Sequence, residues 1–405
     1  MATNKEQNKL NVPHLRFPEF HGEWEKHRLS EYLDFKNGLN PDSKRFGKGI
    51  KFISVMDILN NPVITYDCIR ASVQATDAEI SSFSVENGDI LFQRSSETLE
   101  DVGRANVYID DKVAVFGGFV IRGKKKANYD PLFFRYLLSS PYARKRIIPM
   151  GAGAQHFNIG QEGLSKVSLN FPSIEEQTKI ASLLLLLDER IATQSKLIED
   201  LKKLKSAIID YAINSLDSGF VKFSSLYEMA GEGGTPTTSN ASFYDNGKIP
   251  FIKIDDLKKK YLTENKDFIT ELGLQKSSAW LVPSRSILFS NGATIGEITI
   301  TTYPVCTKQG ILGIVPKPII DVEFLYYFMS SSYFKKAVSR IVTEGTMKTA
   351  YLKDINNIRC PIPIKETQQD IVKMPSALNS KIDFEQSILK LFCSQKQYLL
   401  RQMFM

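Results

Sequence analysis

The fold is decided by the stretch from Ser173 to Asn214, SIEEQTKIASLLLLLDERIATQSKLIEDLKKLKSAIIDYAIN, which contains neither proline nor glycine. Its apolar residues recur at steps of three and four, or sums of these, as they do along the seam of a coiled coil. Ser173 and Glu176 form a capping-box pattern directly after Pro172. The pattern therefore predicts one long helix.

A near-copy of this stretch runs from Pro363 to Phe404, 191 residues later. The same spacing relates Asp130 to Asp321 and Tyr136 to Tyr327, which precede the helix in each copy. The chain is therefore predicted to contain two tandem copies of one unit, each with a globular part followed by a long helix. We expect the helices to pair, or to contact a partner, through seam residues of both copies: Ile180, Leu187, Ile191, Ile198 and Leu201, then Ile371, Leu378, Ile382, Leu389 and Phe392.

The second helix departs from the first where Pro375 replaces Leu184. A proline inside a helix costs about 3 kcal/mol and removes one backbone hydrogen bond. We therefore expect the second helix to kink at Pro375, or to restart with Pro375 in its first turn.

Both globular parts contain short runs of β-branched and aromatic residues separated by glycine, which predict strands. The predicted strands are 50–55, 89–92, 105–109, 113–121 and 167–171 in the first part and 251–254, 286–289, 297–301 and 311–315 in the second, with helices over 131–147 and 321–342. The expected divisions are a tail (1–20), a globular domain (21–170), a helix (171–216), a second globular domain (217–361) and a second helix (362–405). The predicted fold class is α+β, with two similar domains separated by two long antiparallel helices in a coiled coil and related by an internal pseudo-two-fold repeat.

The composition is that of an ordinary globular protein, since 42% of the 405 residues are hydrophobic and 24% are charged. A net charge of +7 permits a nucleic-acid partner without requiring one. The four cysteines are scattered, which indicates a reducing compartment and no zinc site. No apolar run approaches the roughly 18 residues of a membrane span, and no signal peptide is evident, so we expect a cytoplasmic protein without a membrane partner.

Catalytic motifs are missing from the sequence. It contains neither the phosphate loop G-x-x-x-x-G-K-[ST] nor the Asn/Asp-Pro-Pro-aromatic turn of an adenine methyltransferase. A nuclease motif could be assembled from Pro41-Asp42 and Asp110-Asp111-Lys112, but such triplets arise by chance and have no equivalent in the other copy. We therefore expect no catalytic residue, no metal site and no cofactor bound by this chain itself.

Polar loops follow the predicted strands and carry side chains that suit DNA. Arginine and lysine suit guanine, asparagine and glutamine suit adenine, and hydroxyl groups suit phosphate. The DNA-binding candidates are Lys44, Arg45, Lys48, Gln93, Arg94, Ser95, Arg104, Gln155, His156 and Asn158 in the first part, and Thr235, Thr237, Asn240, Ser290, Asn291, Thr294, Lys308, Gln309, Thr346 and Lys348 in the second. Residue by residue, a solvated loop is the simpler interpretation. A duplicated scaffold with divergent loops instead favours two readers of different sequences.

Several short motifs together carry a resemblance to a known family. They include Leu15-Arg16-Phe17-Pro18, Gly88-Asp-Ile-Leu91, Glu176-Gln-Thr-Lys-Ile180 and Asp188-Glu-Arg-Ile191, and the likeness covers essentially the whole chain. The pattern resembles the specificity subunit of type I restriction-modification systems. This implies two target recognition domains, each reading one half of a bipartite site in double-stranded DNA, with the paired helices as the spacer.

The resemblance also implies partners. These are two modification subunits, which bind S-adenosylmethionine and methylate adenine, and two ATP-dependent restriction subunits. S-adenosylmethionine, ATP and Mg²⁺ would belong to those partners. Two alternatives stay open, which are a helical scaffold that joins two proteins without reading DNA and a self-contained nuclease.

Overall fold

The computed structural model describes residues 11–292, 294–342 and 348–405. The chain divides into a front unit, Met1–Gln194 with Ile388–Met405, and a rear unit, Ser195–Ser387. Each unit contains a lobe of short strands and helices together with one part of each of two long helices, α7 (Ile174–Asn214) and α12 (Lys365–Gln402). Each long helix thus has residues in both units.

The front lobe is built on a four-stranded antiparallel sheet of order β2-β10-β6-β8. A second sheet has the order β4-β3-β9-β5, and in it β3 pairs with β9 in parallel. The elements are β1 (Glu25–Arg28), α1 (Leu29–Tyr32), β2 (Leu33–Asn37), β3 (Phe46–Ile53), α2 (Val55–Asn60), β4 (Ser72–Val73), α3 (Asp77–Phe83), β5 (Ser84–Val85), β6 (Ile90–Gln93), β7 (Ser95–Ser96), β8 (Ala105–Val107), β9 (Ala114–Phe116), β10 (Val120–Lys125), α4 (Pro131–Ser139), α5 (Pro141–Ile147), β11 (Phe157–Asn158), α6 (Gln161–Lys166) and β12 (Ser168–Phe171).

The rear lobe repeats this arrangement, with one strand added to its main sheet and one fewer in its second sheet. Its main sheet has the order β14-β21-β18-β19-β16, and a second sheet, β17-β15-β20, again contains one parallel pair, β15 with β20. The elements are β13 (Phe220–Lys222), β14 (Tyr227–Glu232), β15 (Ile249–Ile252), β16 (Tyr261–Leu262), β17 (Asp267–Ile269), α8 (Glu271–Gln275), β18 (Ile287–Ser290), β19 (Ile298–Thr301), β20 (Cys306–Thr307), β21 (Ile311–Pro316), α9 (Val322–Ser330), α10 (Ser332–Ile341), α11 (Leu352–Ile355) and β22 (Arg359–Pro361). The predicted α+β class and internal repeat are confirmed.

The predicted helices over 131–147 and 321–342 are wrong in one respect, because each is broken into two. The break falls at Ser140 in the front lobe and at Ser331 in the rear lobe, and both residues have extended backbone angles. Each serine hydroxyl caps the second helix, accepting from the backbone N–H of Ala143 or Phe334 at 3.3 Å. The serine thus satisfies a free N–H at a new helix start, which favours a sharp turn over continuation.

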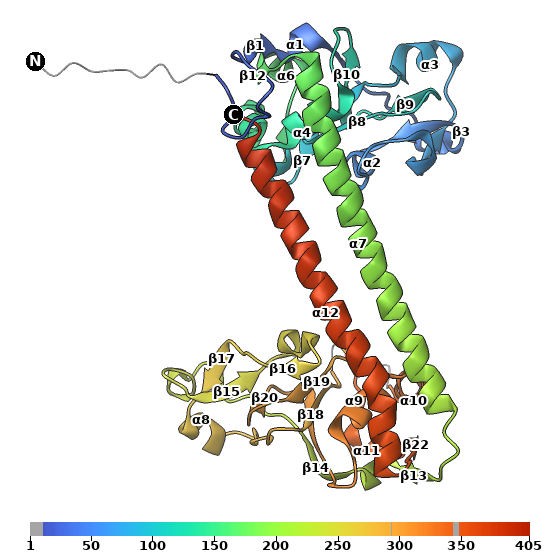
Figure 1. The fold of residues 1–405 in the computed structure, drawn as a ribbon, viewed down its shortest axis with the longest axis vertical. Coiled ribbons are helices and arrows are strands. Elements are labelled where there is room, and N and C mark those ends of the chain that lie inside the picture. The colour runs from blue at the N-terminus through green and yellow to red at the C-terminus, as the bar shows by residue number, and fades with distance from the viewer. Residues whose placement is uncertain (1–10, 293, 343–347) are drawn as a thin grey trace, which may run out of the picture. The chain divides into compact units, whose positions relative to one another are not determined.

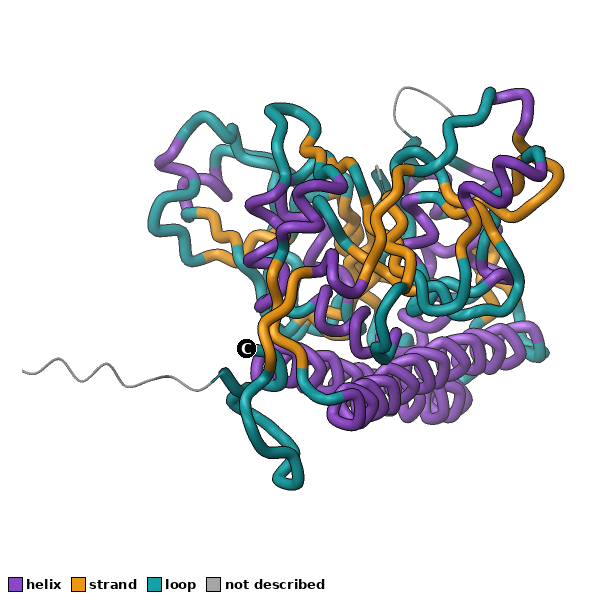
Figure 2. The backbone as a smooth tube through the Cα atoms, turned by 90° about the horizontal axis from the view of Figure 1, so that it is seen from above, coloured by secondary structure: helices purple, strands orange, loops and turns teal. Residues whose placement is uncertain are grey.

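The two long helices are antiparallel partners, and both views show them side by side (Figure 1 and Figure 2). In the front unit, Asp188 of α7 forms an ion pair with Lys396 of α12. In the rear unit, Lys205 of α7 donates to Oδ1 of Asn379 on α12 at 2.9 Å. Among the predicted seam residues, Ile180, Leu187, Ile198 and Ile382 are buried, and Ile191, Leu201, Ile371, Leu378, Leu389 and Phe392 are half-buried.

Of the two outcomes expected at Pro375, the restart is wrong, because α12 is one element from Lys365 to Gln402, and the kink stays a prediction. Pro375 is buried. Proline has no backbone N–H, so the helix lacks one hydrogen bond here. Burial of the proline ring offsets this loss, as it would not in an exposed helix.

Each lobe closes its hydrophobic core with residues from the long helices. The front core includes Leu184 of α7, together with Met403 and Phe404 just beyond α12. The rear core includes Ile209 and Ile213, near the end of α7. In the part of the chain that the structure describes, no helix combines the length and the apolar character needed to cross a membrane.

Candidate nucleic-acid interface

Two loops of the front lobe that are about 60 residues apart in sequence meet beside the end of β6. Strand β7 pairs with β11, so that Ser95 lies opposite Asn158, and the Ser95 hydroxyl donates to Oδ1 of Asn158. The backbone N–H of Arg94 donates to the carbonyl of Phe119 at 2.9 Å, which brings in a third loop. We call residues 93–96, 117–119 and 152–158 the front loop cluster.

The side chains of the front loop cluster divide into exposed and internal ones. Gln155, His156 and Asn158 are exposed, and Arg94 is half-buried with one N–H donated to the carbonyl of Gly118 at 3.3 Å. Gln93 is buried, and its amide nitrogen donates to the carbonyl of Ser95 at 2.9 Å. Gln93 therefore shapes the loop, whereas Arg94, Gln155, His156 and Asn158 present polar groups at its surface.

The predicted cationic loop at residues 44–48 contributes unevenly. Lys44 and Lys48 are exposed. Arg45 instead binds Glu79 and donates to the carbonyl of Gln74 at 2.8 Å. The hydrogen bond from Arg45 is the main reason that the pKa of Glu79 falls to about 2. Arg45 is thus engaged within the lobe.

An apolar hollow next to the front loop cluster was missed by sequence reasoning. A cavity of about 490 Å³ is lined by Phe46, Met56, Ser95 and Phe119, among others. Phe119 is 69% exposed, although it is aromatic. The signal in the sequence was the turn Gly117-Gly118-Phe119, where two glycines bring the aromatic ring to a loop tip.

Arg104 does not join the front loop cluster. It forms an ion pair with Asp101 at 2.6 Å and lines a separate cavity of about 430 Å³ together with Arg135 and Arg144. Burial lowers the pKa of Arg144 to about 10. The Arg144 guanidinium donates to the backbone carbonyls of residues 100, 102 and 103, so it stabilises a loop.

Four segments of the rear lobe meet at the matching place, beside the end of β18. The backbone of Asn291 bonds to Gly310 at 3.0 Å and to Ala350 at 2.9 Å, and the Thr235 hydroxyl accepts from the N–H of Gln309 at 3.3 Å. We call the described residues of 235–240, 290–294, 308–310 and 348–350 the rear loop cluster.

In the rear loop cluster the predicted candidates again divide by exposure. Ser290 is buried and Asn291 is 1% exposed, with its amide donating to the carbonyl of Ala350 at 3.3 Å. Asn240 is exposed and caps a short turn by accepting from the N–H of Ser242 at 3.1 Å. The other exposed candidates are Thr237, Thr294, Lys308, Gln309 and Lys348, while Thr235 is half-buried. Thr346 lies outside the described residues.

The two loop clusters occupy equivalent places but differ in chemistry. Each lies where the central strand of the main sheet ends, at β6 or β18, and each includes the turn that leads into the next central strand, β10 or β21. The front loop cluster offers an arginine, a histidine and amides, and the rear loop cluster offers lysines, hydroxyls and amides. One frame thus carries two different sets of hydrogen-bonding groups. Within the described ranges, no group of His, Cys, Asp or Glu side chains could hold a metal ion.

A different kind of surface lies on the long helices. On α7, Leu186, Leu197, Leu204 and Tyr211 are exposed, and Tyr211 is 76% exposed. Their steps of 11, 7 and 7 residues place them on one face of the helix. On α12, Phe384, Leu391 and Tyr398 are likewise exposed at steps of 7. We call these two sets the exposed stripes, and large exposed apolar surfaces of this kind mark contacts with other proteins.

Comparison with known proteins gives a consistent result over almost the full length. The family described as type I restriction modification DNA specificity domain matches residues 21–203 and 217–391. The MjaVIII type I restriction enzyme specificity subunit of Methanocaldococcus jannaschii is 22% identical over 413 aligned positions, covering 95% of this chain and 92% of the relative. The HindI specificity subunit of Haemophilus influenzae is 22% identical and covers 73% of this chain and 80% of the relative.

A solved structure has the same fold. The crystal structure of a type I restriction-modification S subunit from M. genitalium aligns with a TM-score of 0.56 at 17% identity, covering 97% of this chain and 99% of that one.

Proposed function

Because the chain belongs to the family of type I restriction-modification DNA specificity subunits, we propose that its two lobes each read one half of a bipartite DNA target. The resemblance found in the sequence is confirmed, and the chain is the non-catalytic, DNA-specificity component of such a system. The front loop cluster would read one half-site and the rear loop cluster the other.

The observation that carries this proposal is the pairing of one strand frame with two different loop chemistries. Phosphate contacts position a protein on DNA, whereas contacts with base edges distinguish sequences. Arg94 and Gln155 in the front loop cluster, and Lys308 and Gln309 in the rear one, are exposed or half-exposed groups of the kind that bind guanine and adenine edges. A repeated frame with unlike groups is suited to two unlike half-sites.

Exchange of residues 21–170 with those of a relative tests the division of labour. The complex with the modification subunits should then methylate a target in which one half has changed and the other half is unaltered. Sequencing of methylated DNA from cells that make the hybrid measures this. A change in both halves, or in neither, would contradict the proposal.

The alternative of a scaffold that reads no DNA makes a different prediction about salt. Contacts with phosphates release bound counterions, so the affinity of the assembled complex for its target should fall steeply as salt rises. Arg94→Gln and Lys308→Gln should each reduce that slope, while Lys258→Gln, at an exposed residue outside the loop clusters, should not. A complex whose DNA affinity is independent of this chain would support the scaffold.

The exposed stripes supply the proposed contact with partner subunits. An amphipathic helix of a partner can cover an apolar face whose anchors recur every 7 residues. We therefore assign the stripes to two modification subunits, which would bring S-adenosylmethionine, and through the full complex to two restriction subunits, which would bring ATP and Mg²⁺. Because these partners act on DNA in the cell, a cytoplasmic location is part of the same proposal.

A further inference from the structure

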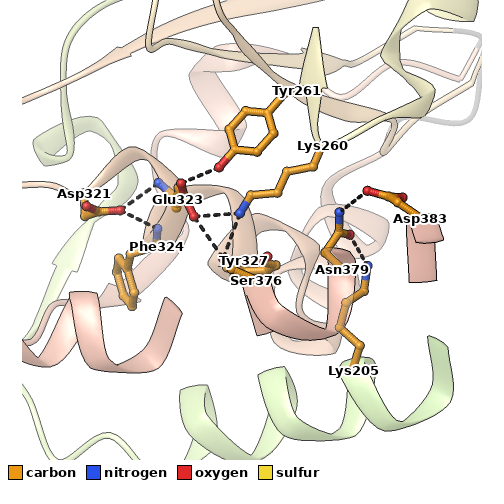
Figure 3. Close-up of polar contacts among 10 residues, drawn as sticks. All are labelled: Lys205, Lys260, Tyr261, Asp321, Glu323, Phe324, Tyr327, Ser376, Asn379 and Asp383. Carbon is orange, nitrogen blue, oxygen red and sulfur yellow. Dashed lines mark hydrogen bonds and ion pairs between the residues drawn. The ribbon is translucent and has the colours of Figure 1, made fainter. Parts of the chain in front are cut away.

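A buried lysine joins three elements of the rear unit (Figure 3). Lys260 precedes β16, and its side chain is 3% exposed. Its ammonium group lies 2.6 Å from Oε2 of Glu323 on α9 and 2.9 Å from the hydroxyl of Ser376 on α12. The Ser376 hydroxyl also donates to Glu323 at 3.0 Å. One cation, one carboxylate and one hydroxyl therefore connect the lobe to the long helix.

Aromatic rings complete the surroundings of Lys260. The ammonium nitrogen lies 4.7 Å from the ring centre of Tyr327 and 4.9 Å from that of Tyr261. The Tyr261 hydroxyl donates to Glu323, and the Tyr327 hydroxyl lies 3.1 Å from that of Ser376. A charge removed from water is costly unless it is paired and hydrogen-bonded. Here the cation has two oxygen partners and lies near three ring faces, the third being that of Tyr326 at 6.0 Å.

The carboxylate of this cluster belongs to Glu323, in the first turn of α9, and Asp321 caps that turn. Asp321 accepts from the backbone N–H of Glu323 at 2.8 Å and of Phe324 at 3.1 Å, which fixes the first turn of α9. The backbone N–H of Asp321 donates to Gln368 of α12 at 2.8 Å. Burial opposes ionisation of Glu323, but hydrogen bonds from Lys260 and Tyr261 leave its pKa below the ordinary value. The start of α9 is thus tied to α12 at Gln368 and again at Ser376.

The front unit has the first of these ties, and its second tie uses different residues. Gln177 accepts from the backbone N–H of Asp130 at 3.1 Å, as Gln368 does from Asp321. The residues equivalent to Glu323 and Ser376, 191 positions earlier, are Leu132 and Leu185. Instead Tyr136, the equivalent of Tyr327, donates to Asp188 of α7 at 2.8 Å, so each lobe has its own side-chain bond to a long helix. The polar cluster of the rear unit supplies direction in addition to cohesion, because hydrogen bonds are directional and dispersion contacts are not.

We infer that Lys260, Glu323 and Ser376 are positioning residues that fix the orientation of the rear lobe on α12 and thereby the phase at which the second half-site is read. This inference rests on the proposed function and deepens it. One base pair of spacer moves a half-site by about 3.4 Å along the DNA and turns it by about 35°, since 10 to 10.5 base pairs make one turn. A lobe held in one orientation discriminates between spacers that differ by one base pair. A lobe free to rock does not.

The variant Ser376→Ala isolates the link between the lobe and the helix. It removes one hydroxyl and leaves the ion pair of Lys260 with Glu323, and alanine favours a helix more than serine does. Ser387→Ala is the matched control, because the Ser387 hydroxyl is on the same helix and, among the described residues, bonds to the backbone of Asp383 at 2.9 Å. Melting temperatures of both variants show whether the fold is kept.

The measurement is the rate at which the complex methylates duplexes whose spacer is one base pair longer or shorter, relative to the natural spacer. We expect Ser376→Ala to raise this ratio about fivefold, the equivalent of one net hydrogen bond, while Ser387→Ala leaves it unchanged. An unchanged ratio for Ser376→Ala would overturn the inference and leave the proposed function intact. A wild-type complex that methylates no bipartite site would overturn both.

A second measurement needs neither DNA nor partners. Spin labels at Asp255→Cys, in the turn before Lys260, and at Asp370→Cys, on α12, report the distance between lobe and helix in a chain whose exposed Cys393 and half-buried Cys68 are replaced by serine. Ser376→Ala should broaden the distance distribution and Ser387→Ala should not. Equally narrow distributions would contradict a role in orientation.

Discussion

At the scale of single residues, the front unit contains an ion pair, between Arg16 and Glu176, that its sequence pattern does not reveal. Glu176 looks like the acidic member of a capping box, but its side chain is 1% exposed and binds Arg16 through both oxygens, at 2.8 and 2.7 Å. The indole N–H of Trp24 lies 3.4 Å from the same carboxylate. Sequence reasoning found the conspicuous residues but not their pairing, because the partners are 160 positions apart.

Arg16→Met should destabilise the front unit by about 3 to 5 kcal/mol, because it leaves the buried carboxylate of Glu176 without its cation. Urea denaturation of the purified chain measures the loss. The control is Lys179→Met, which breaks an exposed ion pair with Glu19 and should cost less than about 1 kcal/mol. Equal effects of the two substitutions would show that the Arg16 pair contributes no more than a surface pair.

At the scale of elements, the long helices were predictable and the short ones only in part. The apolar period over 173–214 predicted α7 almost to the residue, because a pattern of more than ten turns averages out local exceptions. The breaks at Ser140 and Ser331 could not be predicted from periodicity, since apolar spacing continues across them. The persistence of α12 through Pro375 depended on packing, which a one-dimensional pattern does not contain.

Two polar pairs lie at equivalent positions of the seam between the helices. One joins opposite charges, and the other joins a charge to a neutral amide. Asp188 meets Lys396 in the front unit, while Asn379 meets Lys205 in the rear unit. Burial lowers the pKa of Lys205, partly offset by Asp383, so its charge is under-compensated. Asn379 also donates to Asp383 at 3.2 Å, and the front equivalent of Asp383 is Ala192.

Converting the rear pair into the front pair should stabilise the rear unit. The double variant Asn379→Asp with Asp383→Ala supplies a carboxylate to Lys205 and removes the second carboxylate that would repel it, for an expected gain of about 1 kcal/mol. The pKa of Lys205 is lower in the folded chain than in the unfolded chain. Its charge therefore costs stability at every pH at which Lys205 is protonated in both states. The gain should therefore be present at pH 7 and fade as the pH rises through 10.5.

Melting temperatures at pH 7 and above pH 10 check this expectation. Asn379→Asp alone should gain less, since two carboxylates four residues apart on a helix repel each other. A larger gain from the single variant than from the double one would show that Asp383 does not act on this pair.

At the scale of the whole molecule, the sequence revealed a repeat, and the repeat revealed the family. The lobes share the order of four main-sheet strands, the capping serines and the bonds of Gln177 and Gln368 to the start of a preceding helix. The loop clusters were predictable as lists of polar residues but not as surfaces. Whether a side chain such as Asn291 faces outward depends on its contact with Ala350, 59 positions away.

The exposed stripes make a prediction about assembly. Leu204→Glu on α7 and Leu391→Glu on α12 place a charge in an apolar contact and should each weaken binding of the modification subunits by at least about tenfold, because central apolar anchors dominate such interfaces. Ser206→Glu is the control, since residue 206 is exposed and lies more than half a turn from Leu204.

Titration of the labelled chain with modification subunits measures these affinities. All three variants should keep the melting temperature of the parent, because the substituted side chains are exposed in the free chain. Equal binding by Leu204→Glu and Ser206→Glu would place the partner on another face.

The core of the front unit is completed late during synthesis, because it includes Phe404. Trp24 and Phe133 pack against Phe404, whose ring lies 6.5 and 5.6 Å from theirs. The rear unit is one continuous segment, so a ribosome completes it before it reaches the residues that seal the front core. At 5 to 20 residues per second, the front lobe waits about 10 to 40 seconds with an apolar surface open to chaperones and proteases. The part of the protein that is translated first is thus the last to mature.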